Sequence, residues 1–182
     1  MSAGVIIGVD PGKATAWTAL HVEEGRPAVV HAFGVLDFDD DETPEEWAGG
    51  SAREWLSDRC WVTDQMLARD TIVAVETPSR VHLRAASGGI TPSLATGLLF
   101  AKGIAVALAS AAAPLGVSFA CCDAATWRKR VVGRPNASDA QVKAALERAV
   151  RAKRLAELPR TNCHVRDAIG VALWAKDTER RP

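Results

Sequence analysis

The 182-residue sequence predicts an α/β domain in which a mixed five-stranded sheet is flanked by helices. Three apolar segments rich in β-branched residues follow one another within the first 38 residues, as consecutive antiparallel strands do. Two further strand-like segments, 71–76 and 116–122, alternate with segments of helical periodicity, which is typical of a sheet covered by helices. The length and the 48% hydrophobic content predict one domain, residues 1–182, with a substantial core.

The first predicted strand, residues 5–9, is apolar and runs into a single carboxylate, Asp10, just before a Pro-Gly turn. The chain resumes as a second strand over 15–22, which predicts a hairpin. A second turn leads to a third strand within 28–38, rich in β-branched and aromatic residues. Three antiparallel strands therefore open the domain.

Helical spacing follows the third strand. Thr43, Pro44 and Glu46 have the pattern of a helix start, with a capping threonine, a proline in the first turn and a returning glutamate. An apolar helical face follows over 52–67, and a glycine pair at 49–50 is able to break its first turn.

The remaining segments alternate between strand and helix. The short strand 71–76 also ends at a carboxylate, Glu76, and a loop rich in glycine and serine follows it. The later predicted elements are a long alanine-rich helix at 93–113, a strand at 116–122, and helices at 123–132, 138–153 and 163–176.

The chain carries no clear signal for a membrane or for export. Its longest apolar helical segment, 97–113, is short for a membrane span and is interrupted by Lys102 and Ser110. The N-terminus lacks a basic region followed by an apolar stretch and a cleavage site, so we expect a cytoplasmic protein without a membrane partner. The four cysteines are expected to be reduced and structural; the alternative is a zinc site from Cys163, His164 and the pair at 121–122.

Charge is unevenly distributed along the chain, although the net charge is zero. Residues 1–121 contain eight lysines and arginines against fifteen aspartates and glutamates, whereas residues 122–182 contain fourteen against seven. This asymmetry predicts a basic face able to bind a polyanion. Much of the acidic excess is the run 37–46, which we interpret as a solvated loop.

Two predicted strands end in carboxylates, and pairing these strands side by side would bring Asp10 and Glu76 together. Like charges at that distance need a cation. In the last predicted helix, His164 and Asp167 are three residues apart and project from one face, whereas Arg166 points elsewhere. Such ligands suit Mg²⁺ or Mn²⁺, and two ions about 3.5 to 4 Å apart can activate water and stabilise the leaving oxygen of a phosphodiester.

Each of these residues also has a simpler explanation. Asp10 before Pro-Gly fits the start of a turn, Glu76 fits a strand end at the surface, and His164 fits a helix cap beside Asn162. The combination is more specific than its parts. A strand-end aspartate, a strand-end glutamate and a helical His-x-x-Asp in one α/β domain favour a metal site.

These motifs, in this order, resemble the RuvC family of Holliday junction resolvases, within the ribonuclease H-like superfamily. The stretch IIGVDPG looks like the family's first strand with its catalytic aspartate, VAVET like the strand with its glutamate, and HVRDAIGVALWA like its final helix. GLLFAKGIAVALA is similar to the central helix, and WRKRVVGRPNASDAQV to the basic segment before the penultimate helix. The resemblance covers about residues 5–176 and implies a ribonuclease H-like fold.

The resemblance implies that Asp10, Glu76 and Asp167 are catalytic, metal-binding carboxylates and that His164 stands where family members have an aspartate or a histidine. It implies an endodeoxyribonuclease that uses Mg²⁺, with Mn²⁺ as a substitute and two ions per active site. We expect Asp10 to bridge both ions, Glu76 to bind one, and His164 with Asp167 to bind the other. The implied partner is branched DNA, and a homodimer would nick two opposed strands of a four-way junction. The alanine-rich helix is a candidate for the dimer interface.

The chain departs from the family pattern in two regions. Arg128 occupies one position of a family lysine near the active site, and Asp139 falls where another lysine is usual, so phosphate contacts are expected to differ. In the loop after the glutamate, family members often present an aromatic residue to the junction, whereas this chain offers only His82 and Leu83. The sequence therefore supports nuclease chemistry more strongly than junction specificity.

DNA binding needs cations near the acidic pocket, because the carboxylates repel phosphates. Five basic side chains lie near the predicted acidic residues and are candidates for DNA contact: Arg80, Arg84, Arg128, Lys129 and Arg130. The alternative for the run 128–130 is a solvated helix face, and the neighbouring Trp127 is expected in the core.

Three other functions are compatible with the sequence. A nuclease of the same superfamily could act on flaps, other branched DNA or structured RNA. The stretch GVDPGKATA resembles the phosphate loop of actin-like sugar kinases and ATPases, but that fold needs two such domains and a second loop, and no second D-x-G element appears. A DNA-binding module that does not cleave is the third, which the intact acidic set disfavours.

Overall fold

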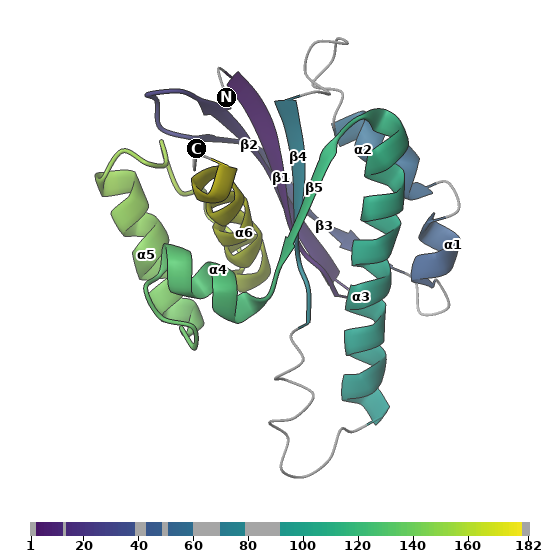
Figure 1. The fold of residues 1–182 in the computed structure, drawn as a ribbon. Coiled ribbons are helices and arrows are strands. Elements are labelled where there is room, and N and C mark those ends of the chain that lie inside the picture. Colours follow the sequence, from purple (N-terminus) through teal and green to yellow (C-terminus); the bar gives the residue numbers. More distant parts are fainter. Residues whose placement is uncertain are drawn as a thin grey trace.

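The computed structural model describes residues 3–12, 14–38, 43–48, 51–59, 70–78 and 92–179. Five strands form one sheet through the middle of the molecule, in the order β3-β2-β1-β4-β5 (Figure 1). The strands are β1 (Ala3–Asp10), β2 (Ala14–Glu23), β3 (Val29–Asp37), β4 (Thr71–Glu76) and β5 (Ser118–Cys122). The predicted α/β class with a mixed five-stranded sheet is confirmed.

The sheet is mixed because its two halves are connected differently. β1, β2 and β3 form the predicted antiparallel meander, with a register shift between Ala19 and Leu20 of β2. β1 also pairs in parallel with β4, and β4 with β5. The carboxyl ends of the two neighbouring inner strands β1 and β4 therefore lie side by side, at the same end of the sheet.

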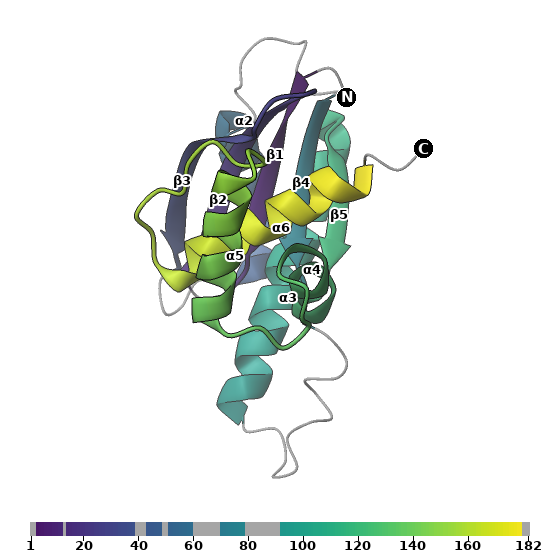
Figure 2. The same cartoon turned by 90° about the vertical axis from the view of Figure 1, so that its left-hand side faces the viewer.

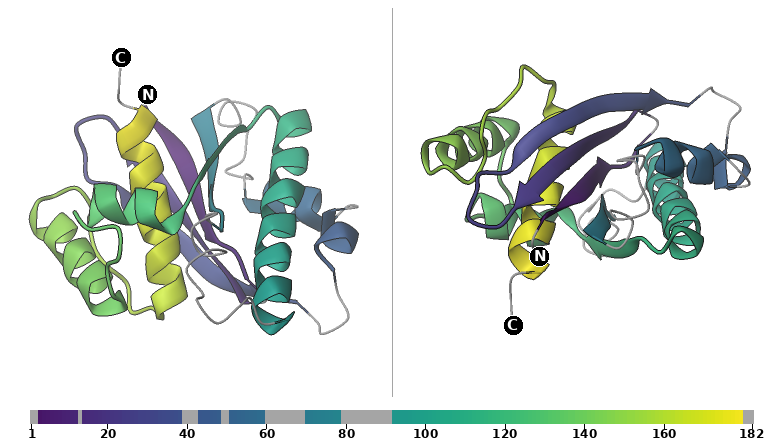
Figure 3. Two further views of the ribbon diagram at one scale, coloured as in Figure 1. Left: turned by 60° about the horizontal axis from the view of Figure 1, so that its bottom comes forward. Right: turned by 90° about the horizontal axis from the view of Figure 1, so that it is seen from above.

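Helices cover both faces of the sheet (Figures 1 and 2). On one face lie α4 (Ala124–Val131), α5 (Asp139–Arg151) and α6 (Cys163–Glu179); on the other lie α1 (Pro44–Ala48), α2 (Ser51–Arg59) and α3 (Pro92–Ala112). The two views of Figure 3 show the sheet between these two layers. Alternate β1 side chains enter different cores: Ile6 packs on the α5–α6 side, and Val5, Ile7 and Val9 pack on the α2–α3 side.

Capping side chains mark the helix starts. Thr43 and Glu46 form the predicted reciprocal cap of α1, in which the Glu46 N–H donates to Thr43 Oγ1 at 3.3 Å and the Thr43 N–H donates to Glu46 Oε2 at 2.9 Å. Asp123 caps α4, because its Oδ1 accepts from the Thr126 N–H at 2.7 Å. The helical face predicted after the glycine pair corresponds to α2, and its later part, 60–69, lies outside the described residues.

α3 continues into a short 3-10 turn, η2 (Ala113–Leu115). The segment Ala95–Leu115 is long and apolar enough to cross a membrane on length and composition alone. A helix in a protein core meets the same criterion, and 39% of the most apolar stretch of this one is buried inside the protein. One such helix is weak evidence for a membrane span.

α6 approaches β1 closely at Gly8. A Cβ added to Gly8 would overlap the carbonyl oxygen of Ala168 and lie 2.8 Å from the Cβ of Ala172. Gly8 precedes the strand-end Asp10 by two residues, and Ala168 directly follows Asp167 on α6. Glycine at this position therefore sets how near the first turns of α6 come to the end of β1.

Gly8→Ala is expected to lower the free energy of unfolding by about 1 to 3 kcal/mol, because the added methyl group overpacks the contact between β1 and α6. Gly97→Ala is the control, since a Cβ added there on α3 meets no atom within 4 Å. That variant should be as stable as the wild type, or slightly more stable, because alanine favours a helix. Urea unfolding measures both, and a Gly8→Ala protein of wild-type stability would contradict the prediction.

Candidate active site

The two predicted strand-end carboxylates lie next to each other, where the neighbouring strands β1 and β4 end. β1 and β4 are in parallel register through the residue before each carboxylate, so Asp10 and Glu76 leave the sheet side by side. The turn after Asp10 is closed by Thr15, whose hydroxyl donates to the Gly12 carbonyl at 2.6 Å and accepts from the Gly12 N–H at 3.1 Å. The pairing of these strands is as the sequence predicts.

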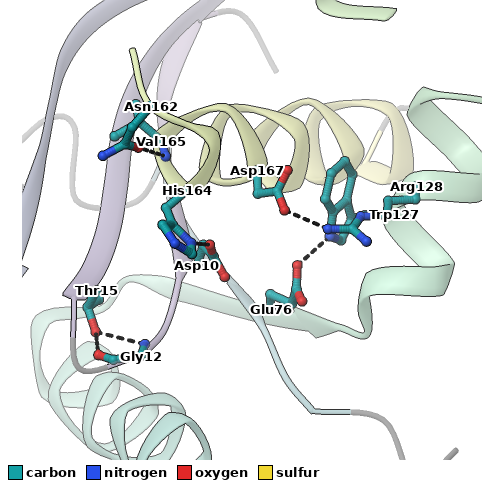
Figure 4. A network of polar contacts seen from close by, with 10 residues as sticks. All are labelled: Asp10, Gly12, Thr15, Glu76, Trp127, Arg128, Asn162, His164, Val165 and Asp167. Carbon is teal, nitrogen blue, oxygen red and sulfur yellow. Dashed lines mark hydrogen bonds and ion pairs between the residues drawn. The ribbon is translucent and has the colours of Figure 1, made fainter. Parts of the chain in front are cut away.

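The first turns of α6 bring the other two predicted residues to the same place (Figure 4). His164 Nδ1 lies 2.9 Å from Asp10 Oδ2, and the His164 side chain is 59% exposed. Asp167 lies one helical turn later and is buried. The helix is capped by Asn162, whose Oδ1 accepts from the Val165 N–H at 2.9 Å. His164 is therefore free of the capping role that the sequence also allowed.

Two adjacent residues of α4 reach the carboxylates from the opposite side of the site (Figure 4). Trp127 donates its Nε1–H to Glu76 Oε2 at 2.6 Å, and Arg128 donates from Nη2 to Asp167 Oδ2 at 2.6 Å. Trp127 is fully buried, as predicted for a core residue, but its hydrogen bond has no signature in the sequence. Arg166 turns away and donates to a backbone carbonyl instead, also as predicted.

Burial raises the pKa of both strand-end carboxyl groups. The pKa of Asp10 rises to about 6, mainly because the group is desolvated; the hydrogen bond from His164 opposes the rise, and repulsion from Asp167 adds to it. The pKa of Glu76 rises to about 7, again mainly by desolvation, with repulsion from Asp10 adding and the hydrogen bond from Trp127 opposing. In the absence of a cation, Glu76 is therefore partly protonated at neutral pH, and Asp10 takes up its proton at a pH about one unit lower.

Asp167 shares this environment. Burial raises its pKa, and the hydrogen bond and charge of Arg128 oppose the rise. Its second oxygen, Oδ1, is buried without a hydrogen-bond partner among the described residues, and so is Arg128 Nε. A buried polar atom without a partner is unfavourable, so Oδ1 is an acceptor ready for a cation or a water molecule.

A cleft of about 310 Å³ opens beside the carboxylates. It is lined by Glu76 and Arg128 together with small and apolar residues of α3, namely Gly97, Leu98 and Ala101. The cleft therefore gives a substrate access to Glu76 and Arg128 along α3.

The donor set fits a hard divalent cation, because three carboxylates and one imidazole are suitable ligands and Asp167 Oδ1 has no other partner. Among the described residues, no three possible ligands are grouped closely enough to hold an ion as they stand, and each carboxylate is instead paired with a protein donor. Cation binding would therefore require some of these side chains to turn. The alternative zinc site of Cys163, His164 and the pair at 121–122 is likewise not formed in the described part of the chain.

The predicted DNA-contacting residues fall into three groups. Arg80 and Arg84 lie outside the described residues. Arg128 is not on a solvated helix face, because its side chain is 23% exposed and paired with Asp167. Lys129 and Arg130 are exposed on α4 and line an open hollow of about 460 Å³.

No protein-family model matches the chain, and no curated protein matches its sequence. Solved structures do match. Thermus thermophilus RuvC has a TM-score of 0.66 at 21% identity, over 97% of this chain and 95% of that one. T. thermophilus RuvC in complex with a Holliday junction substrate has a TM-score of 0.66 at 19% identity over the same shares. The yeast mitochondrial Holliday junction resolvase Ydc2 has a TM-score of 0.58 at 11% identity, over 98% of this chain and 82% of that one.

The chain has a RuvC-like fold. This confirms the ribonuclease H-like architecture and, at the level of fold, the resemblance to the RuvC family seen in the sequence motifs. The likeness extends over nearly the whole chain, so the sheet edge that carries Asp10 and Glu76 belongs to the RuvC-like core and not to an added segment.

The raised pKa of Glu76 predicts a pH-dependent stability of the metal-free protein. Between pH 4.5 and about 7 the folded state binds more protons at Glu76 than the unfolded state does, so stability falls as pH rises through this window. Glu76→Gln removes this fall and keeps an acceptor for Trp127. At pH 8 it should raise the free energy of unfolding by about 1 to 3 kcal/mol, since one pKa unit is worth 1.36 kcal/mol.

Urea unfolding in EDTA at pH 4 and pH 8 measures the effect. At pH 4 the variant and the wild type should have nearly the same stability, because Glu76 is then protonated in the folded state and mostly protonated in the unfolded state. Asp10→Asn should flatten the lower part of the same window, from pH 3.8 to about 6. Equal pH slopes in Glu76→Gln and the wild type would show that Glu76 does not titrate in this range.

Proposed function

We propose that this chain is a divalent-metal-dependent endodeoxyribonuclease that resolves four-way DNA junctions by paired nicks. The observation that carries the proposal is the meeting of Asp10, Glu76, His164 and Asp167 at one edge of a RuvC-like sheet. The structural neighbours support it, since they include a RuvC in complex with a Holliday junction substrate and a mitochondrial Holliday junction resolvase.

The same four residues would hold two Mg²⁺ ions, which Mn²⁺ could replace. When bound, the ions would activate a water as nucleophile and stabilise charge on the leaving oxygen. Cation binding would lower the raised pKa values of Asp10 and Glu76, and Glu76 would lose the proton that it partly holds at neutral pH, because a cation favours the ionised carboxylate. Asp167 would turn from Arg128, which leaves that guanidinium for the phosphate.

Basic residues beside the cleft would bind the DNA backbone. The planar guanidinium of Arg128 lines the cleft and is suited to bidentate contact with a phosphate. Lys129 and Arg130 extend this charge along α4, where they line the open hollow together with Trp174 of α6. Contacts of this kind position the backbone and do not read base sequence, which suits an enzyme that recognises a branched structure.

Paired nicks need two active sites, so a homodimer is part of the proposal. α3 presents apolar side chains to solvent: Leu99 is 70% exposed and Val106 is 58% exposed. An apolar groove of about 680 Å³ lies along this side of α3 and shares Thr77, Pro78 and Leu98 with the active-site cleft. A second copy on this face would therefore sit next to the active site.

Asp10→Asn should lower the rate of cleavage of a four-way junction by about 10²- to 10³-fold, the scale on which loss of one charge-stabilising group lowers kcat. Junction binding should persist, because the basic residues of α4 are unchanged. Gel assays with Mg²⁺ and end-labelled DNA measure cleavage, and gel shifts in EDTA measure binding. Full activity of Asp10→Asn would overturn the assignment of the active site.

The same assay separates the proposed substrate from its alternatives. A four-way junction, a flap, a duplex, a single strand and a structured RNA are tested in parallel, with EDTA as the metal-free control. Symmetrical paired nicks on the junction alone support a resolvase. Cleavage of flaps or RNA as well indicates a nuclease of broader specificity, and tight junction binding without cleavage indicates a binding module.

Val106→Glu should convert a dimer to a monomer, because burying an unpaired carboxylate in an apolar interface is strongly unfavourable. Val29→Glu on β3 is the matched control, since Val29 is 42% exposed and lies on a different element. Light scattering measures the mass of each variant. A wild-type monomer at the concentration of the cleavage assay, or a Val106→Glu dimer, would contradict an interface on this face of α3.

A further inference from the structure

Trp127 is a core tryptophan whose one polar atom donates a hydrogen bond to Glu76, a carboxylate of the proposed active site. The side chain is fully buried, and its Nε1–H donates to Glu76 Oε2 at 2.6 Å (Figure 4). An indole N–H is a donor only, so the bond has one possible direction. Glu76 keeps a second oxygen for another partner.

Burial alone does not explain this pairing. Trp55 of α2 is also buried, at 8% exposure, and its Nε1 has no hydrogen-bond partner among the described residues. Within the described residues, the core on the other face of the sheet therefore contains a buried indole N–H without a partner. The pairing of Trp127 with Glu76 follows from where the ring is placed.

The placement of the ring is set by α6 and by the start of α4. A Cβ added to Gly170 of α6 would overlap the six-membered ring of Trp127, so the ring lies directly on the helix backbone. The N-cap Asp123 fixes the first turn of α4 immediately after β5. With only two side-chain torsions and a closely packed ring, the Trp127 N–H is a rigid donor.

Arg128, the next residue on α4, contacts a second carboxylate. Arg128 donates to Asp167, which lies one turn before Gly170 on α6, and the Arg128 guanidinium carbon lies 5.2 Å from the centroid of the Trp127 ring. The position of the ring therefore influences both Glu76 of β4 and Asp167 of α6.

We propose that Trp127 is a positioning residue that holds the Glu76 carboxylate by Oε2, so that the other oxygen of Glu76 is presented to a divalent cation. Gly170 is part of this arrangement, because the Trp127 ring needs the space that a glycine leaves on α6. This inference rests on the proposed function, in which Glu76 is a metal ligand. Residues that orient metal ligands in this way commonly change metal affinity or activity by about 10- to 100-fold when they are replaced.

Trp127→Phe tests the inference because it keeps an aromatic ring at position 127 and removes the N–H donor. Trp55→Phe is the matched control, since it makes the same chemical change at a buried indole without an observed partner. Calorimetric titration with Mn²⁺ alone measures cation affinity, single-turnover cleavage of a four-way junction measures the rate, and gel shifts in EDTA measure DNA affinity. Trp127→Phe should bind Mn²⁺ about 10-fold or more weakly and cleave about 10- to 100-fold more slowly, with unchanged DNA affinity.

Trp55→Phe should match the wild type in all three measurements. Equal Mn²⁺ affinity and equal rate in the two variants would overturn the role of Trp127 and leave the proposed nuclease function intact. Wild-type protein that binds no Mn²⁺ and cleaves no junction would overturn the proposed function together with this inference. The two failures are therefore distinguishable.

A measurement on the wild-type protein keeps the inference testable if Trp127→Phe does not fold. The chain has six tryptophans, and the indole N–H signals in a ¹H–¹⁵N spectrum can be assigned by replacing the other five singly with phenylalanine. On titration with Mg²⁺ the Trp127 signal should shift and saturate, and the Trp55 signal should stay in place. A Trp127 signal that does not move at Mg²⁺ concentrations that support cleavage would overturn the inference.

Discussion

Three carboxyl groups lie in one desolvated region, where β1 and β4 end beneath α6. The side chains around them are those that compensate their charge. Burial raises the pKa of Asp10, Glu76 and Asp167. Each is paired with a different donor: an imidazole, an indole N–H and a guanidinium. These donors compensate only part of the cost of burying the carboxyl groups, since all three pKa values stay raised. The metal-free site is therefore suited to accept further positive charge.

The fold tolerates these buried carboxyl groups because its stability comes from the two apolar cores on the faces of the sheet. β1 is the central strand and supplies side chains to two separate cores, one under α5 and α6 and one under α2 and α3. Both cores are apolar and lie along the sheet, whereas the carboxyl groups lie at its end. Unfavourable electrostatics are thus confined to a small region whose positions are held by well-packed elements, as is common for functional sites.

The structure shows where the basic segment of the sequence lies. The basic segment of the chain, residues 122–182, contains α4, α5 and α6, which together cover one face of the sheet beside the strand-end carboxylates (Figures 1 and 2). A protein with no net charge can therefore present a cationic face next to an acidic pocket. This arrangement suits the proposed DNA substrate, because the backbone needs cations where the cleaved phosphate approaches carboxylates.

Much of the architecture could be predicted from local pattern alone. Strand and helix periodicity, the Thr43–Glu46 cap and the two strand-end carboxylates are encoded within short windows, since they depend on side-chain alternation and capping chemistry. The order of Asp10, Glu76, His164 and Asp167 along the chain, together with the family resemblance, predicts that these four residues form one set. The structure brings these four residues together.

Other features were decided only by the tertiary structure, because they depend on contacts between residues far apart in sequence. Trp127 and Glu76 are 51 positions apart, and no local pattern distinguishes a core tryptophan that donates to a carboxylate from one such as Trp55. The pairing of Arg128 with Asp167 is hidden for the same reason. The sequence by itself determined which elements form and which acidic groups end them; helix packing on the sheet, through Gly8 and Gly170, decided which donors those groups meet.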